Sequence, residues 1–369
     1  MEPELREKPD GARPGEGGAR RAAPAAALLL ALAACDLPTD APNWDTRWQV
    51  PAQGASFSVE DFLPAGVEED PDSGGFLLDA DPVSFGRTLA ELCPPCAQAE
   101  GQTVPKPAFT AELGSSLSLP DDVESVDLAA GTVIVHAGHD FDFDPIRPGQ
   151  GNTGELKVEL VDADDGRSLA SVTADGETEA FPPGQDGRLE WEVELEPGQV
   201  GGGFEVRVLL ESPEGDDVEV DGESSLQVEV VPGALEAASA RIRAGGLAAD
   251  LSPVSLDVEG LDAEVVDRVE EGALLLEVSN PFGVGLEAEV TIAGQGFPDI
   301  HRSVALSSEP SSGVEVSLSG EELRSFLGRP GVTLSGTAAV PGHESVMTVG
   351  PGQVVDLDFR IDLTLRMGS

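Results

Sequence analysis

The closing segment of the chain, VVDLDFRIDLTLRM, alternates apolar and polar residues without a break. Every second side chain from Val355 to Met367 is apolar, and charged or polar residues fill the positions between them. Because the side chains of a β-strand point alternately to its two faces, this segment predicts one long strand with a single buried face. A membrane strand shows the same alternation, but the other expected strands have acidic polar faces and no aromatic girdles. The pattern therefore favours a packed β-sheet core.

Turn residues and further alternating runs extend this prediction to most of the chain. Glycine and proline together account for 73 of 369 residues (44 and 29), so turns are frequent. The run GELKVELVDADDGRSLASVT alternates on both sides of an Asp165-Gly166 turn and predicts a hairpin. We expect a mainly all-β protein with two tandem antiparallel β-sandwich domains of immunoglobulin-like type and a few short helices.

Length and local composition predict four parts along the chain. The 335 residues that follow an expected leader (369 minus 34) suffice for two or three domains with cores of their own. Trp44 and Trp48 are expected to pack an irregular segment onto these domains. The parts are a leader (1–34), an irregular N-terminal segment (35–106), a first β-sandwich (107–233) and a second β-sandwich (234–369).

A repeated plan supports the division into two sandwiches. Residues 131–141 align without gaps on residues 272–282, and both stretches lead into an alternating strand. Later strands follow in the same order: LEWEVEL corresponds to GVEVSLS, FEVRVLL to GVTLSGT, and LQVEVV to the closing strand. Exact identities are few, so true duplication stays open. The alignment places His136 opposite Glu277 and His139 opposite Asn280, at a strand end and its exit turn.

The N-terminal sequence predicts export. Two arginines precede a thirteen-residue apolar stretch, Ala22–Ala34, which is shorter than the roughly 20 residues that cross a bilayer. Its end, Leu-Ala-Ala-Cys, resembles the lipobox of bacterial lipoproteins. This resemblance implies that Cys35 is lipidated and becomes the first residue of a mature protein anchored to the inner or outer membrane of the cell envelope, on its periplasmic or surface face. An ordinary signal peptide with a chance cysteine is the alternative.

The charge of the chain limits its partners. Its formal net charge is −48, so nucleic acid and anionic lipid headgroups are repelled unless a cation bridges them. Basic proteins and divalent cations remain possible partners. Solubility is the simpler explanation of the charge.

Two further cysteines and two histidines carry the metal and redox alternatives. Cys93 and Cys96 are expected to form a local disulfide in an oxidising compartment. Redox catalysis requires the pair at a helix start, whereas FGRTLAELCPPC predicts that it ends a helix stopped by Pro94.

Cys93, Cys96, His136 and His139 would also suffice for tetrahedral zinc. Because residues three apart on a strand face opposite ways, only a turn after Val135 would bring these histidines together. No other cofactor is expected.

An acidic run follows the histidines. Asp140, Asp142 and Asp144 resemble the opening of a calcium loop, but Pro145 occupies the position where an EF-hand requires glycine, and no glutamate closes the loop. Phe141 and Phe143 alternate with the aspartates. The run therefore favours a half-buried strand with solvent-facing aspartates.

The remaining sequence gives little support to an enzymatic function. It has no Gly-x-Ser-x-Gly elbow, phosphate loop or His-Glu-x-x-His motif, and His301 and His343 stand alone in turn-like contexts. LLLEVSNPFGVGLEAEVTI resembles the late-embryogenesis-abundant type 2 domain, an immunoglobulin-like sandwich, which implies binding or stabilisation rather than catalysis. We expect a non-catalytic, lipid-anchored envelope protein that acts as a structural or interaction module, with the membrane bound through Cys35 and an envelope protein as a possible partner. A carrier of an apolar ligand and a divalent-cation-binding protein are the alternatives.

Overall fold

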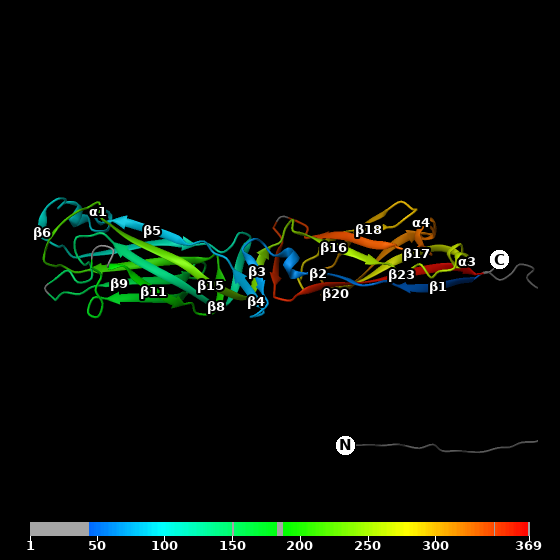
Figure 1. Ribbon diagram of the computed structural model, residues 1–369, viewed down its shortest axis with the longest axis horizontal. Coiled ribbons are helices and arrows are strands. Elements are labelled where there is room, and N and C mark those ends of the chain that lie inside the picture. The colour runs from blue at the N-terminus through cyan, green and yellow to red at the C-terminus, as the bar shows by residue number, and fades with distance from the viewer. Residues whose placement is uncertain (1–43, 150, 183–186, 343, 368–369) are drawn as a thin grey trace, which may run out of the picture. The chain divides into compact units, whose positions relative to one another are not determined.

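The protein is mainly β, with several antiparallel sheets and short helices (Figure 1). The computed structural model describes residues 44–149, 151–182, 187–342 and 344–367. Its architecture confirms the all-β sandwich class expected from the alternating runs. The helices of the described residues are η1 (Val59–Phe62), α1 (Leu89–Leu92), α2 (Pro94–Ala97), α3 (Ala263–Val266) and α4 (Gly320–Phe326).

The first sandwich is built from two antiparallel sheets. One has the order β10 (Ser168–Asp175), β9 (Glu155–Asp162), β13 (Phe204–Ser212), β7 (Phe109–Leu117). The other has the order β11 (Leu189–Glu194), β8 (Val123–His139), β15 (Ser225–Arg243), with β5 (Val83–Thr88) also paired to β15. Contacts of β5 with β7 and of β10 with β11 close the two sheets over a common core.

The second sandwich has the same construction. One sheet has the order β19 (Ile300–Leu306), β18 (Leu286–Ala293), β21 (Thr333–Ala339), β16 (Ala248–Ser255). The other has the order β20 (Ser311–Ser319), β17 (Val269–Ser279), β23 (Val354–Met367), and β23 also pairs with β1 (Trp44–Pro51) and β2 (Ala55–Ser58).

Strand order therefore repeats between the sandwiches as the sequence alignment predicts. Strands β8, β9, β11, β13 and β15 of the first sandwich occupy the same sheet positions as β17, β18, β20, β21 and β23 of the second. Between the third and fourth strands of these series, the first sandwich inserts β12 (Gly198–Gly201), which pairs with β8, and the second inserts α4.

The closing segment forms the single strand β23 and buries one face, as its alternation predicts. Phe359 at its centre is 1% exposed and lies opposite Leu276 of β17. The intervening charged residues, such as Asp358 and Arg360, remain exposed. The buried apolar side chains are Val355, Leu357, Phe359, Ile361, Leu363 and Leu365.

The N-terminal segment is not irregular, contrary to the expectation from sequence. Its first two strands join the second sandwich through β23, and β5 joins the first through β15. These strands are short, and β1 exposes most of both faces, so they lack the period of two that marks a half-buried strand. The remaining strands of the segment are β3 (Val67–Asp70) and β4 (Gly75–Leu78), which pair with each other, and β6 (Thr103–Pro105), which pairs with β14 (Asp217–Glu219).

The boundary expected between residues 233 and 234 falls inside β15, so this strand continues across it. Beyond that point β15 keeps its pairing with β8 and also pairs with β4 and with β22 (Val346–Val349). The long strand thus extends the sheet of the first sandwich toward residues that the sequence assigned to the second.

Candidate functional site

The cysteine pair lies at the junction of two short helices, with Cys93 between α1 and α2 and Cys96 inside α2. The Sγ atoms of Cys93 and Cys96 are 1.99 Å apart, at disulfide distance, and both residues are fully buried. Cys93 ends α1 and also caps α2, where its Sγ accepts a hydrogen bond from the Cys96 N–H at 3.1 Å. The prediction that the pair only ends a helix is therefore wrong. Pro94 does not stop the chain from being helical, because the first position of a helix needs no N–H donor.

His139 is a buried structural side chain at the end of β8. The Phe141 N–H donates to its Nδ1 at 3.2 Å, so Nε2 carries the proton and donates to the Phe181 carbonyl oxygen at 2.8 Å. The rings of both phenylalanines pack against the imidazole, with centroid distances of 4.9 and 4.4 Å. Burial lowers the pKa of His139. Both ring nitrogens are thus occupied in a neutral imidazole.

His136 points to the other face of β8, as the spacing on an extended strand requires. Its cross-strand neighbours are Glu190 of β11 and Glu229 of β15, and its Nδ1 lies 3.3 Å from the Glu190 carboxylate. The chain does not turn after Val135, since β8 continues to His139. The structure therefore does not bring the two histidines together.

The proposed zinc ligands do not form a site in this arrangement. The cysteine sulfurs are at bonding distance from each other, and the nitrogens of His139 contact protein groups. Within the ranges that the structure describes, no group of three or more histidine, cysteine or acidic residues is placed to hold a metal ion.

The acidic run after His139 is a bend rather than a strand, which corrects the sequence interpretation. Phe141 and Phe143 are buried as predicted and stacked at 5.6 Å, and Asp140 and Asp142 are exposed, but Asp144 is half-buried. Asp144 organises the bend. One carboxylate oxygen accepts from the Ile146 and Arg147 N–H groups at 2.9 Å each, and the other accepts from the Phe181 N–H at 2.8 Å. These three bonds from backbone N–H groups to the Asp144 carboxylate stabilise the loop.

Asn280 has the same role in the second sandwich as His139 in the first. It is 1% exposed, and its Oδ1 accepts from the Phe282 N–H at 3.1 Å, two residues further on, as His139 does from Phe141. Its Nδ2 donates to the carbonyl oxygens of Val284 at 2.7 Å and Ser307 at 2.9 Å. The sequence alignment predicts this equivalence, and it shows that the position ties a strand end to a neighbouring loop.

Lys106 is buried, and sequence reasoning assigned it no role. Its side chain is 1% exposed, and Nζ donates to the Pro213 carbonyl oxygen. Nζ also lies 5.1 Å from the ring centroid of Phe109 and 5.7 Å from that of Phe143. Burial lowers the pKa of Lys106 to about 8. A buried ammonium among two aromatic rings and a carbonyl oxygen connects β7 to the loops around it.

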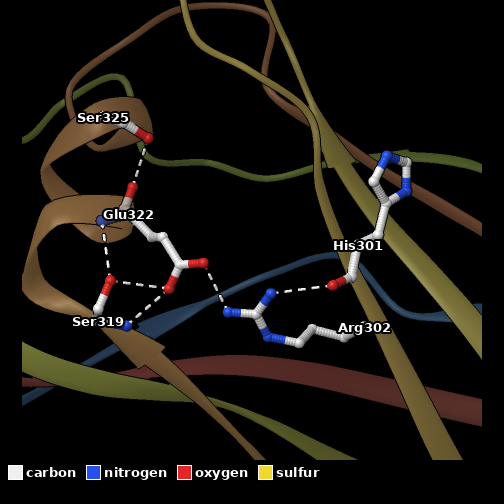
Figure 2. Close-up of polar contacts among 5 residues, drawn as sticks. All are labelled: His301, Arg302, Ser319, Glu322 and Ser325. Atoms are coloured by element: carbon white, nitrogen blue, oxygen red, sulfur yellow. Dashed lines mark hydrogen bonds and ion pairs between the residues drawn. The ribbon is translucent and has the colours of Figure 1, made fainter.

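A charged cluster at the start of α4 is shown in Figure 2. Glu322 accepts from the Ser319 backbone N–H at 2.9 Å and from its hydroxyl at 2.8 Å, which forms a capping box. Arg302 of β19 donates to the other carboxylate oxygen at 2.7 Å. Hydrogen bonding to Arg302 and Ser319 lowers the pKa of Glu322 to about 2. His301, next to this pair, lies in β19 and contacts Thr291 at 3.0 Å, not in a turn as expected.

Two polar grooves lie on the outer faces of the first sandwich. One, of about 740 Å³, follows β8, β15 and β5, and the other, of about 460 Å³, follows β7, β9 and β13. Neither offers an apolar ligand an enclosed site between the sheets. Residues lining the first include Ser84, His136, Gly138, Arg188, Gln227 and Glu229.

The tryptophans of β1 do not pack the N-terminal segment onto the domains as expected. Trp44 is 54% exposed and Trp48 is 41% exposed, although β1 itself is paired to β23. Cys35 and His343 lie outside the described residues. In the described part of the chain, no helix is long and apolar enough to cross a membrane.

No family model and no curated protein matches this chain. Among solved structures it is similar to a predicted secreted protein from Parabacteroides distasonis, at 10% identity and a TM-score of 0.30, over 86% of this chain and 99% of that one. It is also similar to an N-terminal CBM22 tandem domain from Paenibacillus barcinonensis, at 9% identity and a TM-score of 0.18, over 87% and 99% of the two chains. At these values the similarities carry no functional information.

Proposed function

We propose that this protein is a non-catalytic, lipid-anchored component of the bacterial cell envelope that acts as a structural or interaction module. One observation supports the proposal most strongly. Four of the chemistry-bearing side chains that stand out in the sequence are held by protein partners within the fold: Cys93 and Cys96 by each other, His139 by two backbone groups, and Asp144 by three. Side chains that are bonded in this way stabilise the fold.

The leader and the first strand support the lipid anchor. Strand β1 begins nine residues after Cys35 (44 minus 35), and it pairs directly with β23 of the second sandwich. A lipid on Cys35 would thus be joined to a folded domain by a short connection. The buried cysteine pair suits the oxidising compartment that export implies.

The anchor is tested by expressing the full chain in bacteria supplied with an alkyne-bearing fatty acid. The wild-type protein should carry the label and sediment with membranes. Cys35→Ser should carry no label and move to the soluble fraction. The double variant Cys93→Ser/Cys96→Ser is the matched control, and it should be labelled like the wild type. A full-length Cys35→Ser protein that stays with membranes would remove the basis of the proposal.

A further inference from the structure

Strand β1 exposes two large aromatic side chains, nine and thirteen residues after the expected lipid attachment point, Cys35, in the sequence (44 minus 35 and 48 minus 35). Trp44 and Trp48 are exposed by 54% and 41%, whereas most large apolar side chains of the described residues are buried. Residues four apart on a strand lie on the same side, about 13 Å from each other. The strand therefore presents a pair of indole rings to its surroundings.

The charge of β1 differs from that of the chain as a whole. Its sequence, WDTRWQVP, contains one acidic residue, Asp45, and one basic residue, Arg47, so its formal charge is zero. The whole chain carries −48. A negatively charged protein approaches a membrane surface with least repulsion through a neutral segment, because headgroup phosphates repel the acidic faces. Strand β1 is such a segment.

The length of chain between Cys35 and β1 keeps the strand near the membrane. Nine residues span at most about 30 Å when fully extended. Tryptophan is enriched at the membrane–water interface, where its ring is in contact with the apolar region and its N–H with water. A lipid at Cys35 would therefore hold both rings within reach of the layer that tryptophan favours.

We propose that Trp44 and Trp48 insert into the interface of the bilayer that carries the Cys35 anchor, and so orient the second sandwich on the membrane. The inference rests on the proposed lipid anchor. The occupant of this surface is a phospholipid bilayer. Apolar and aromatic contacts of this kind add to a covalent lipid and fix the orientation that the lipid alone leaves free.

The test uses acylated full-length protein purified from membranes and reconstituted into phosphatidylcholine vesicles. Trp191→Phe provides the background, because Trp191 is a half-buried side chain of β11 and its emission would mask the other two. In vesicles whose lipids are brominated near the glycerol end of the acyl chains, the emission of Trp44 and Trp48 should shift to the blue and lose intensity. Trp44→Ser/Trp48→Ser in otherwise wild-type protein should leave the remaining Trp191 emission unquenched.

A second arm uses the Cys35→Ser protein with the same vesicles. It should bind weakly, bind less to vesicles that contain phosphatidylglycerol because of the charge of −48, and lose binding in the Trp44→Ser/Trp48→Ser background. Labelled, membrane-bound protein whose tryptophans are not quenched would overturn this inference and leave the anchor intact. The inference would also be overturned if the tryptophans were not quenched and the protein self-associated only when both Trp44 and Trp48 were present. That result would assign the two tryptophans to contacts between copies of this protein. A protein that is not lipidated would instead overturn the proposed function.

Discussion

Replacing Phe359 by alanine removes the central core side chain of β23. The residue is 1% exposed and faces Leu276 of β17, which is itself 1% exposed. Its carbonyl oxygen accepts a hydrogen bond from the Ala52 N–H at 3.1 Å, at the place where the N-terminal segment passes from β1 to β2. Truncation leaves a cavity beneath three paired strands whose backbones are fixed by hydrogen bonds, so the site can close only in part.

The expected loss follows from this burial. Truncating a buried phenylalanine to alanine costs about 3 to 5 kcal/mol, a large part of the roughly 5 to 15 kcal/mol that stabilises a domain. Asp358→Ala is the matched control on the other face of the same strand. Asp358 is exposed and lies opposite Glu277, so its removal relieves a like-charge pair and should leave stability unchanged or slightly higher.

Urea denaturation measures both effects. Far-UV circular dichroism reports on the whole chain, while Trp48 in β1 reports on the sheet that contains β23 once Trp44 and Trp191 are replaced by phenylalanine. Phe359→Ala should move the Trp48 transition to much lower urea, and Asp358→Ala should not. Equal and small shifts for the two variants would refute the conclusion that β23 buries its apolar face.

Three further predictions concern titrating groups. Burial lowers the pKa of His139 below its usual 6.5, so the stability that the neutral ring contributes is complete above pH 6.5 and is lost as pH falls below that value. His139→Asn should reduce this fall in the urea midpoint of unfolding. An unchanged dependence of the midpoint on pH would contradict the assignment of His139 as a buried neutral side chain. The pKa of Lys106 is about 8 in the folded protein and near 10.5 in the unfolded one. The free energy of unfolding should therefore increase as the pH is raised from 8 to 10.5, by at most about 3 kcal/mol. Calorimetry of Lys106→Met should show no such increase. Arg302→Ala should cost about 0.5 to 1 kcal/mol of stability at pH 7, a small loss because the ion pair with Glu322 is partly exposed. This cost should disappear as the pH falls from 4.5 toward 2 and Glu322 is protonated. A cost that does not change with pH would contradict the ion pair.

The sequence predicts those parts of the fold in which one face of a strand is buried. The alternation around Phe359 and the hairpin of β9 and β10 both follow from the period of two. The gapless alignment predicts the repeated strand order and the equivalence of His139 and Asn280. Each of these predictions depends on a pattern that core packing imposes on neighbouring residues.

The sequence fails where a strand lies at an edge or where partners are distant. Strand β1 exposes both faces, so its residues show no periodicity. The prediction that Trp48 packs onto the domains depends on its residue type alone. The partner of Lys106 is the Pro213 carbonyl oxygen, 107 positions away, and backbone groups leave no mark in a sequence. Pro94 predicts a helix stop from sequence because proline at the first helical position gives the same local signal.

The central claim is that Cys35 anchors an exported protein to the envelope, and the mass of one peptide tests it most directly. Trypsin should release Cys35–Arg47, because Arg47 is the first basic residue after Cys35. From membrane-extracted protein, we expect this peptide to begin at Cys35 and to carry the added mass of a lipid. A peptide that continues upstream of Cys35, or one that begins there without added mass, would contradict the account.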